Sequence, residues 1–271
     1  MSTPNLNALG EKVIATATNT DKIKEFEYLE HVSIIELDLN SDEEEIASVV
    51  RDAIKIHGHV TRLINNAGYV MIACMEEMSI SQVKHLMNTN YWGAISLTNA
   101  FLPHFQGRKS GEKFIAIISS IGGIQKLLSL SYYCDFKYAL EASFEALKME
   151  TEHFGLNVML IEPGGFRTSI LEEVSSRQRN PISDYDSISG ALYRMLKTQI
   201  EIFFGDPKVG CMRIIALLTN TGLAKQIGNG EVPTRVALGS RSYENTIKKG
   251  EELIDNATKW KEFSFSTDYK N

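Results

Sequence analysis

The sequence predicts an α/β protein built on a doubly wound parallel sheet with helices on both faces. Short runs of β-branched and apolar residues alternate with amphipathic segments of about ten residues or more, which are long enough for helices. Strands separated by such helices pair in parallel through right-handed crossovers. The chain has no internal repeat and no low-complexity linker, so its 271 residues are expected to form one domain.

Five strands are expected, each a short run of β-branched or apolar residues. They are residues 12–18, 32–39, 62–64, 113–120 and 156–161. The carboxyl ends of parallel strands meet at one edge of a sheet, and ligands bind outside that edge. Four polar or turn-forming residues lie at these ends and are expected to converge there: Asp38, Asn66, Ser120 and Pro163.

Capping residues mark the helices between these strands. A polar segment at 19–21 begins the first helix, and Ser41 begins the second, whose first turn is acidic as the helix dipole favours. Glycine ends helices because it adopts the left-handed backbone, and proline bounds them. The second helix is expected to end at Gly58. A third helix is expected from Ser79 to Leu102, bounded by Pro103, and a fourth from Ser131 to Gly155.

Composition excludes several classes of function. The chain has 28 Lys and Arg against 34 Asp and Glu, so the basic surface that binds nucleic acid is missing. No stretch reaches the roughly 20 apolar residues of a membrane helix, and residues 1–10 lack a basic or apolar leader, so a cytoplasmic protein is expected. The cysteines lack CxxC spacing, which fits a reducing compartment. His57 and His59 are interpreted as a solvated pair, and no metal is expected.

Tyr133 and Lys137 carry the chemistry that the residues suggest most directly. They are four apart on an expected helix and share a face, so the ammonium is expected to lower the pKa of the phenol from about 10 toward a useful acid-base range. Alone, the pair fits a surface contact better. Ser120 ends a strand before Tyr133 and adds a polar group within reach, although a serine bonding its own turn is the alternative. Tyr132 competes with Tyr133 at a poorer helical spacing from Lys137.

Asn90 lies in the middle of a helix whose inward positions are apolar. A buried amide there costs free energy unless it is hydrogen-bonded. Its partner is either local backbone or a water, and such a water could take part in proton transfer.

Together these residues resemble the short-chain dehydrogenase/reductase family, from about Lys12 to the C-terminus. The resemblance is carried by Asn65-Asn66-Ala67-Gly68, Asn90, Ser120, the motif from Tyr133 to Lys137, and Pro163-Gly164-Gly165-Phe166-Arg167-Thr168. It implies a Rossmann-like fold and hydride transfer between a nicotinamide cofactor and a carbonyl or secondary alcohol. Residues 1–271 would form one domain, with a substrate-side segment at 164–233 and a C-terminal helical extension at 238–271.

The resemblance also implies roles for individual residues. Tyr133 would exchange a proton with the substrate oxygen, and Lys137 would lower its pKa and bind the nicotinamide ribose. Ser120 would hold the substrate oxygen, and Asn90 would anchor a water that relays the proton. Further cofactor contacts are implied for Asp38 with the adenine, Asn66, Ala67 and Gly68 with the adenosine, and Phe166 and Thr168 with the nicotinamide amide.

One segment of the family pattern is missing. Members begin with a strand and a glycine-rich turn that binds the pyrophosphate, whereas residues 12–18 match the family's second strand. We therefore expect an N-terminally truncated sheet that lacks a central strand and has two unpaired edges. An incomplete gene model, a shortened isoform and a divergent protein without cofactor each explain this. We favour the first because the four implied catalytic residues have no use without a nicotinamide; the alternative function is a catalytically silent binding or regulatory protein.

Cofactor and substrate are indicated by weaker signals. Members that prefer NAD carry an acidic residue at the end of the family's second strand, and here no acid occurs before Asp21, so NADP is favoured and NAD is the alternative. The arginine often found near Thr18 in similar proteins, which would bind the phosphate of NADP, is also missing. A lipophilic substrate is indicated by apolar residues that suit a helix core equally well: Phe166, Ile170, Leu171, Tyr185, Tyr193, Met195, Phe203 and Phe204. Small residues at 139, 142 and 146 would permit a homodimer or packing within one chain.

Overall fold

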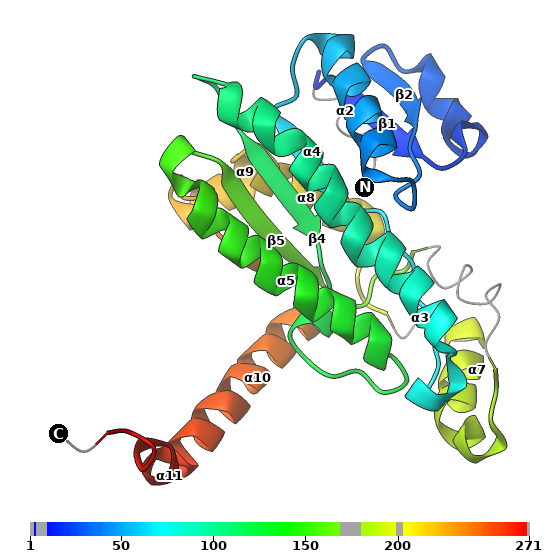
Figure 1. The fold of residues 1–271 in the computed structure, drawn as a ribbon, viewed down its shortest axis with the longest axis vertical. Coiled ribbons are helices and arrows are strands. Elements are labelled where there is room, and N and C mark those ends of the chain that lie inside the picture. The colour runs from blue at the N-terminus through cyan, green and yellow to red at the C-terminus, as the bar shows by residue number, and fades with distance from the viewer. Residues whose placement is uncertain (1–2, 4–9, 169–179, 199–202, 270–271) are drawn as a thin grey trace.

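The computed structural model describes residues 3, 10–168, 180–198 and 203–269 and contains a parallel sheet in two parts (Figure 1). All of the strand pairings in these parts are parallel, which confirms the expected fold class. The two-stranded part consists of β1 (Val13–Ala17) and β2 (Val32–Glu36). The four-stranded part pairs, in order, β3 (Arg62–Asn65), β4 (Phe114–Ile118), β5 (Asn157–Pro163) and β6 (Arg235–Leu238).

Helices cover both faces of the four-stranded sheet. Alternate residues of its strands face opposite sides, as the strand period requires. Ile115, Ile117 and Leu160 pack into one apolar core with α4 and α5, and Phe114 and Met159 pack into a second core with α8. The helices are α2 (Glu43–His57), α3 (Ile80–Met87), α4 (Gly93–Gly107), α5 (Ser131–Thr151), α7 (Ala191–Thr198), α8 (Pro207–Leu218), α9 (Gly222–Gly228), α10 (Ser240–Lys259) and α11 (Lys261–Phe265).

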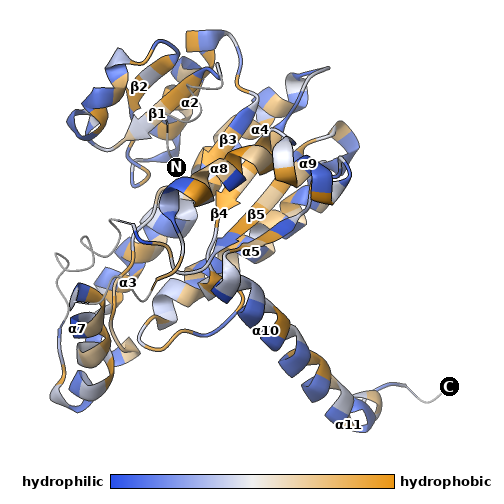
Figure 2. Cartoon of the chain, turned by 180° about the vertical axis from the view of Figure 1, so that it is seen from behind, coloured by the Kyte–Doolittle hydropathy of each residue, from blue (hydrophilic) through white to orange (hydrophobic). Residues whose placement is uncertain are grey.

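The sheet is divided between β1 and β3, where the resemblance places an additional central strand. Within the described residues, no strand pair joins the two parts. Figure 2 shows β1, β2 and α2 set apart from the four-stranded sheet. The edges of β1 and β3 that face away from β2 and β4 are therefore without strand partners in the described part of the chain.

Helix limits agree with the capping pattern in most places. Gly58 ends α2 with a φ of 76°, and Ser79 begins α3 by accepting a hydrogen bond from the N–H of Gln82 at 3.3 Å. Two expectations were wrong. Asp42, not Ser41, caps α2, since its carboxylate reaches the N–H of Glu45 at 2.9 Å. Helix α4 runs through Pro103, because packing of its apolar face outweighs the one backbone bond that proline cannot donate.

The C-terminal segment leaves the body of the protein as a helical arm. Helix α10 projects outward from the end of β6 and is followed by the short α11 (Figure 1). Among the described residues, every helix is either too short or too polar to span a lipid bilayer.

Candidate active site

Asn90 occupies a π-helical turn, η3 (Asn88–Trp92), which joins α3 to α4. Its side chain is buried, its Nδ2 donates to the carbonyl of Leu86 at 2.9 Å, and its Oδ1 accepts from the N–H of Tyr69 at 2.7 Å. Both partners of the Asn90 amide are backbone groups, and backbone was one of the two alternatives, beside a water, that the sequence left open. The side chain thus fixes the segment after β3, and π-turns of this kind are frequent at functional sites.

The segment after β3 is shaped by that contact. A Cβ at Gly68 would lie 2.4 Å from Oδ1 of Asn90, so only glycine fits there. Asn66, Ala67 and Gly68 are exposed at the carboxyl end of the strand. Asn65 donates from its Nδ2 to Thr98 at 3.0 Å, while its buried Oδ1 has no partner among the described residues. This edge therefore offers exposed backbone and a free acceptor.

Ser120 follows β4 and begins the short helix η4 (Ile121–Gly123). Its hydroxyl accepts a bond from the N–H of Gly122 at 3.1 Å, and it lies near enough to the Tyr133 hydroxyl to oppose the rise in the pKa of that phenol. A Cβ at Gly122 would lie 2.9 Å from the Tyr133 ring, so this glycine permits the close approach. Both interpretations of Ser120 hold together: it caps its own turn and it contacts the phenol.

The pKa of Tyr133 does not move as expected. Burial raises it to about 12, and the hydrogen bond with Ser120 lowers it only in part. The expected lowering by Lys137 is wrong for this structure, because the Nζ of Lys137 lies 5.9 Å from the ring centroid and donates to the carbonyl of Ile118 at 2.7 Å. The two side chains share a face of α5, but desolvation dominates the titration of the phenol.

Apolar side chains enclose Tyr133 on the substrate side. It packs in a small cluster with Val70 and Ile72 from the segment after β3 and with α7. The members from α7 are Leu192, Tyr193 and Leu196. Of the apolar residues expected to line a pocket, Tyr193 is therefore in contact with the site, whereas Tyr185 donates to Glu76 at 2.8 Å. Ile170 and Leu171 lie outside the described residues.

Lys137 is held in a desolvated position. Burial lowers its pKa to about 8, and the charge of Glu141 acts in the opposite direction. A lysine with this pKa exists in both protonation states near neutral pH, which suits a group that takes part in proton transfer.

The remaining predicted cofactor contacts are arranged around the other strand ends. Asp38 is exposed after β2 and accepts bonds at 2.9 and 3.1 Å from the N–H and side-chain amide of Asn40. Thr168 is exposed after β5. The ring of Phe166 packs against glycines, because Cβ atoms at Gly205 and Gly210 would lie 2.6 and 2.7 Å from it. Only the backbone of Phe166 is therefore available to a ligand.

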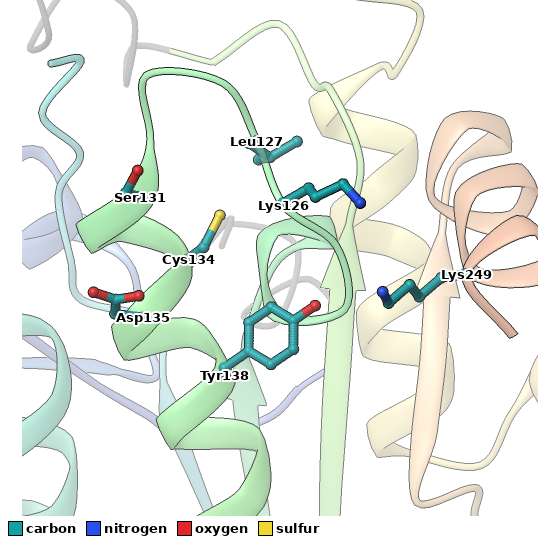
Figure 3. Close-up of a pocket in the computed structure, with 7 residues that line it drawn as sticks. All are labelled: Lys126, Leu127, Ser131, Cys134, Asp135, Tyr138 and Lys249. Carbon is teal, nitrogen blue, oxygen red and sulfur yellow. The ribbon is translucent and has the colours of Figure 1, made fainter. Parts of the chain in front are cut away.

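A separate hollow of about 360 Å³ opens beside another face of α5 (Figure 3). Tyr138 and Cys134 line it from α5, and Lys249 lines it from α10. None of the predicted site residues lines this hollow, so it is distinct from the candidate active site.

Two residues that pack next to the site residues, Glu141 and Ser119, were not predicted from the sequence. Glu141 continues the stripe of Tyr133 and Lys137 by one more helical turn, and Ser119 directly precedes Ser120. The helical spacing at 133, 137 and 141 was the available signal.

The comparisons with known proteins agree with this geometry. A family model for short chain dehydrogenases matches residues 3–179. The chain belongs to the short-chain dehydrogenase family. It is 29% identical over 263 residues to "Oxidoreductase BOA17" of Botryotinia fuckeliana, covering 95% of this chain and 90% of that protein. It is 34% identical over 148 residues to retinol dehydrogenase 8 of Homo sapiens, covering 53% of this chain and 46% of that protein.

Solved structures show the same fold. A short-chain dehydrogenase from Streptomyces avermitilis superimposes with a TM-score of 0.80 at 28% identity, covering 97% of this chain and 91% of that one. Two more distant structures contain a nucleotide. One is ElxO with NADP bound, with a TM-score of 0.63 at 22% identity over 82% of this chain and 86% of that one. The other is a family member from Burkholderia phymatum in complex with NAD, with a TM-score of 0.69 at 18% identity over 80% of each chain.

Proposed function

We propose that this short-chain dehydrogenase transfers hydride between NAD(P) and a carbonyl or secondary alcohol, with Tyr133 as the group that exchanges the proton. The observation that carries the proposal is the packing of Tyr133 against the turn that Ser120 begins, with the Nζ of Lys137 5.9 Å from the Tyr133 ring, at the carboxyl end of β4. The exposed backbone from Asn66 to Gly68 ends the neighbouring strand β3. This is the sheet edge at which ligands bind in doubly wound folds.

The protonation state of Tyr133 favours the reductive direction. With a pKa of about 12 the phenol carries its proton at neutral pH, and a protonated phenol donates to a carbonyl oxygen. A substrate oxygen that lies between the hydroxyls of Tyr133 and Ser120 would accept a hydrogen bond from each. Lys137, with a pKa of about 8, then serves as the nearby group that can return a proton.

The residues present fit the nicotinamide end of a dinucleotide. The exposed residues Asn66 to Gly68 after β3 and the exposed Thr168 after β5 would supply polar groups to it, together with the amine of Lys137. The cofactor, when bound, would supply or accept the hydride. At the pyrophosphate end, the described residues include no strand with a glycine-rich turn ahead of β1, which matches the family's second strand. We favour NADP because Thr18, Asn19 and Thr20 follow β1 without an acid.

A lipophilic carbonyl or alcohol is the proposed substrate. Val70 and Ile72, from the segment after β3, form an apolar cluster against which Tyr133 packs and against which Leu192, Tyr193 and Leu196 of α7 also pack. An apolar wall with a few polar groups is typical of sites for apolar ligands. A relative whose name gives retinol as its substrate supports the same class.

A catalytically silent binding or regulatory protein is the second candidate. The division of the sheet between β1 and β3 favours it, because unpaired strand edges readily pair with another chain. A protein of this kind would bind neither nucleotide.

Titration of the purified chain with NADPH and with NADH, followed by nicotinamide fluorescence, separates the two candidates. The proposed enzyme binds at least one nucleotide, NADPH more tightly, and oxidises it when lipophilic aldehydes or ketones are added. Absence of binding by both nucleotides would favour the silent protein.

The acid is tested by replacing Tyr133 with Phe, using Tyr132→Phe as the matched control on the same helix turn. Loss of a general acid lowers turnover by about 10²- to 10⁴-fold. We expect that loss in Tyr133→Phe with nucleotide affinity nearly unchanged, and near-normal turnover in Tyr132→Phe. The opposite ranking would assign the proton to Tyr132.

A further inference from the structure

Three carboxylates converge on one guanidinium behind the Tyr133–Lys137 pair. Arg235 of β6 bonds Glu141 of α5 at 2.7 Å and Glu162 of β5 at 2.6 Å, both through Nη1. It also bonds Glu145, one turn further along α5, at 3.1 Å. Glu141 and Glu162 are only 3% and 0% exposed, and the proposed reaction uses neither of them.

Glu141 belongs to a stripe of α5 that contacts the end of β4 at consecutive points. The ring of Tyr133 packs against the turn that Ser120 begins, since a Cβ at Gly122 would lie 2.9 Å from it, and Lys137 donates to the carbonyl of Ile118 at 2.7 Å. Glu141 completes the series, because its Oε1 accepts a bond from the hydroxyl of Ser119 at 2.5 Å. The three residues at the end of β4 are thus each held by one member of the stripe.

The turn after Ser120 is packed onto the same carboxylate. A Cβ at Gly123 would lie 1.9 Å from Oε1 of Glu141 and 2.8 Å from the hydroxyl oxygen of Ser119. Glycine at 123 therefore lets Glu141 reach Ser119 under the turn.

The charges of this region balance only if one carboxyl is protonated. Lys137 and Arg235 are cationic, and Glu141, Glu145 and Glu162 are acidic. Burial and the charge of Glu141 raise the pKa of Glu162 to about 7, and its Oε2 has no partner among the described residues. For Glu141, hydrogen bonds from Ser119 and Arg235 oppose the effect of burial on its pKa. Burial raises the pKa of Glu141 as well, but both of its oxygens accept hydrogen bonds, from Ser119 and Arg235. Glu162 has one oxygen without a partner among the described residues and is therefore the better site for the shared proton.

We propose that Glu141 is a positioning residue: its carboxylate fixes Ser119, and so Ser120, against α5, and its charge acts on Lys137 one helical turn away. The kinetic importance of this role rests on the proposed function of Lys137 and Ser120. The electrostatic part does not, because it concerns the free protein.

Two variants separate the charge of Glu141 from its hydrogen bond. Glu141→Gln keeps an oxygen for Ser119 and removes the charge, whereas Ser119→Ala removes the hydrogen bond and keeps the charge. Glu145→Gln is the matched control, since Glu145 lies on the same helix, bonds the same arginine and is more exposed.

The first measurement is the titration of Lys137 by NMR of the full chain with ¹³C-labelled lysine, with the signal assigned by Lys137→Arg. The wild-type midpoint is expected near 8. It moves lower in Glu141→Gln and stays in place in Glu145→Gln and Ser119→Ala. An unchanged midpoint in a folded Glu141→Gln protein would overturn the electrostatic role whether or not the chain is an enzyme.

The second measurement is the pH profile of turnover with NADPH and a lipophilic aldehyde. Activity that needs the ammonium falls as pH rises through the pKa of Lys137. In Glu141→Gln this fall begins at lower pH, so kcat above the midpoint drops by roughly tenfold when the midpoint moves down by one on the pH scale, while KM changes little. Ser119→Ala lowers kcat equally at all pH values. A Glu141→Gln pH profile identical to that of the wild type would overturn the kinetic role of Glu141. Absence of nucleotide binding by the wild type would instead refute the proposed function, and the NMR titration alone would then decide the electrostatic role of Glu141.

Discussion

The two parts of the sheet have similar sequences and very different burial. Strands β1 (VIATA) and β2 (VSIIE) are rich in β-branched residues like β4 (FIAII), although less apolar, and none of their residues is fully buried. In the larger part, Ile115 and Ile161 have no exposed surface. Each central strand there has a partner on both sides and helices on both faces, whereas β1 pairs with β2 alone. Burial in this protein is therefore set by the neighbours of a strand more than by its own residues.

The smaller part is attached to the larger one through loops and helices. Helix α2 packs on α4, and Leu39 after β2 lies against Gly93 at the start of α4. The hydroxyl of Thr89 donates to Asn40 at 3.1 Å, and Glu11 before β1 pairs with Arg62 of β3 at 3.4 Å. These contacts can be changed one at a time, which tests how far the two parts depend on each other.

The largest difference in unfolding free energy is expected when one isoleucine is replaced by alanine in each part of the sheet. Ile115→Ala removes a fully buried side chain, and such changes cost about 2–5 kcal/mol of unfolding free energy. Ile34→Ala in β2 removes a half-buried side chain and should cost roughly 1 kcal/mol, because less apolar surface returns to water. Urea unfolding followed by circular dichroism measures both. Equal losses would mean that the smaller part is packed as tightly as the larger.

A pH-dependent contribution to stability from a buried carboxyl group is expected in the larger part. The folded state raises the pKa of Glu162 from 4.5 to about 7, so the folded protein binds this proton more tightly than the unfolded chain does. Stability from this group is present below pH 4.5 and is lost as pH rises through 7. Glu162→Gln should remove this loss, on the order of 1–3 kcal/mol by pH 8. Glu36→Gln, at the exposed end of β2, is the control, and a pH slope that survives in Glu162→Gln would contradict the assignment.

Gly93→Ala is expected to loosen the smaller part from the larger. A Cβ at this position would lie 2.5 Å from the Cβ of Leu39 and 2.8 Å from its carbonyl oxygen, and a backbone atom cannot rotate away. Overpacking of this kind costs about 1–3 kcal/mol. Amide hydrogen exchange should show reduced protection in β2 and unchanged protection in β4. Gly107→Ala, on the same helix with open space around it, should show neither effect.

The smallest effect is expected for the ion pair that bridges the two parts. Glu11→Gln breaks its contact with Arg62, which is partly exposed and long, so the loss of stability should be below about 1 kcal/mol. Thermal unfolding measures it. The comparison variant is Glu112→Gln, which removes the other carboxylate partner of Arg62. A loss from Glu11→Gln well above this value would show that the junction depends on charge rather than on helix packing.

Local patterns were enough to predict five of the six described strands, most helix limits and the stripe of Tyr133 and Lys137, but not the four-residue β6. Each depends on spacing within one element, which the sequence displays directly. The π-turn at Asn90 was not predictable, because a five-residue hydrogen-bond step leaves no distinct residue pattern. The raised pKa of Tyr133 comes from burial to which α7 contributes, about sixty residues further along the chain. The cluster of Glu141, Glu162 and Arg235 likewise joins three elements that only tertiary folding brings together.

The projecting arm has a mechanical consequence. Helix α10 has 20 residues and so extends for about 30 Å, and its base is fixed where the buried hydroxyl of Ser242 donates to the carbonyl oxygen of Glu162 at 2.7 Å. Further along α10, Glu252 pairs with Lys126 at 3.4 Å. The arm is therefore tied both to the loop before α5 and to the residue whose carboxyl group shares Arg235 with Glu141.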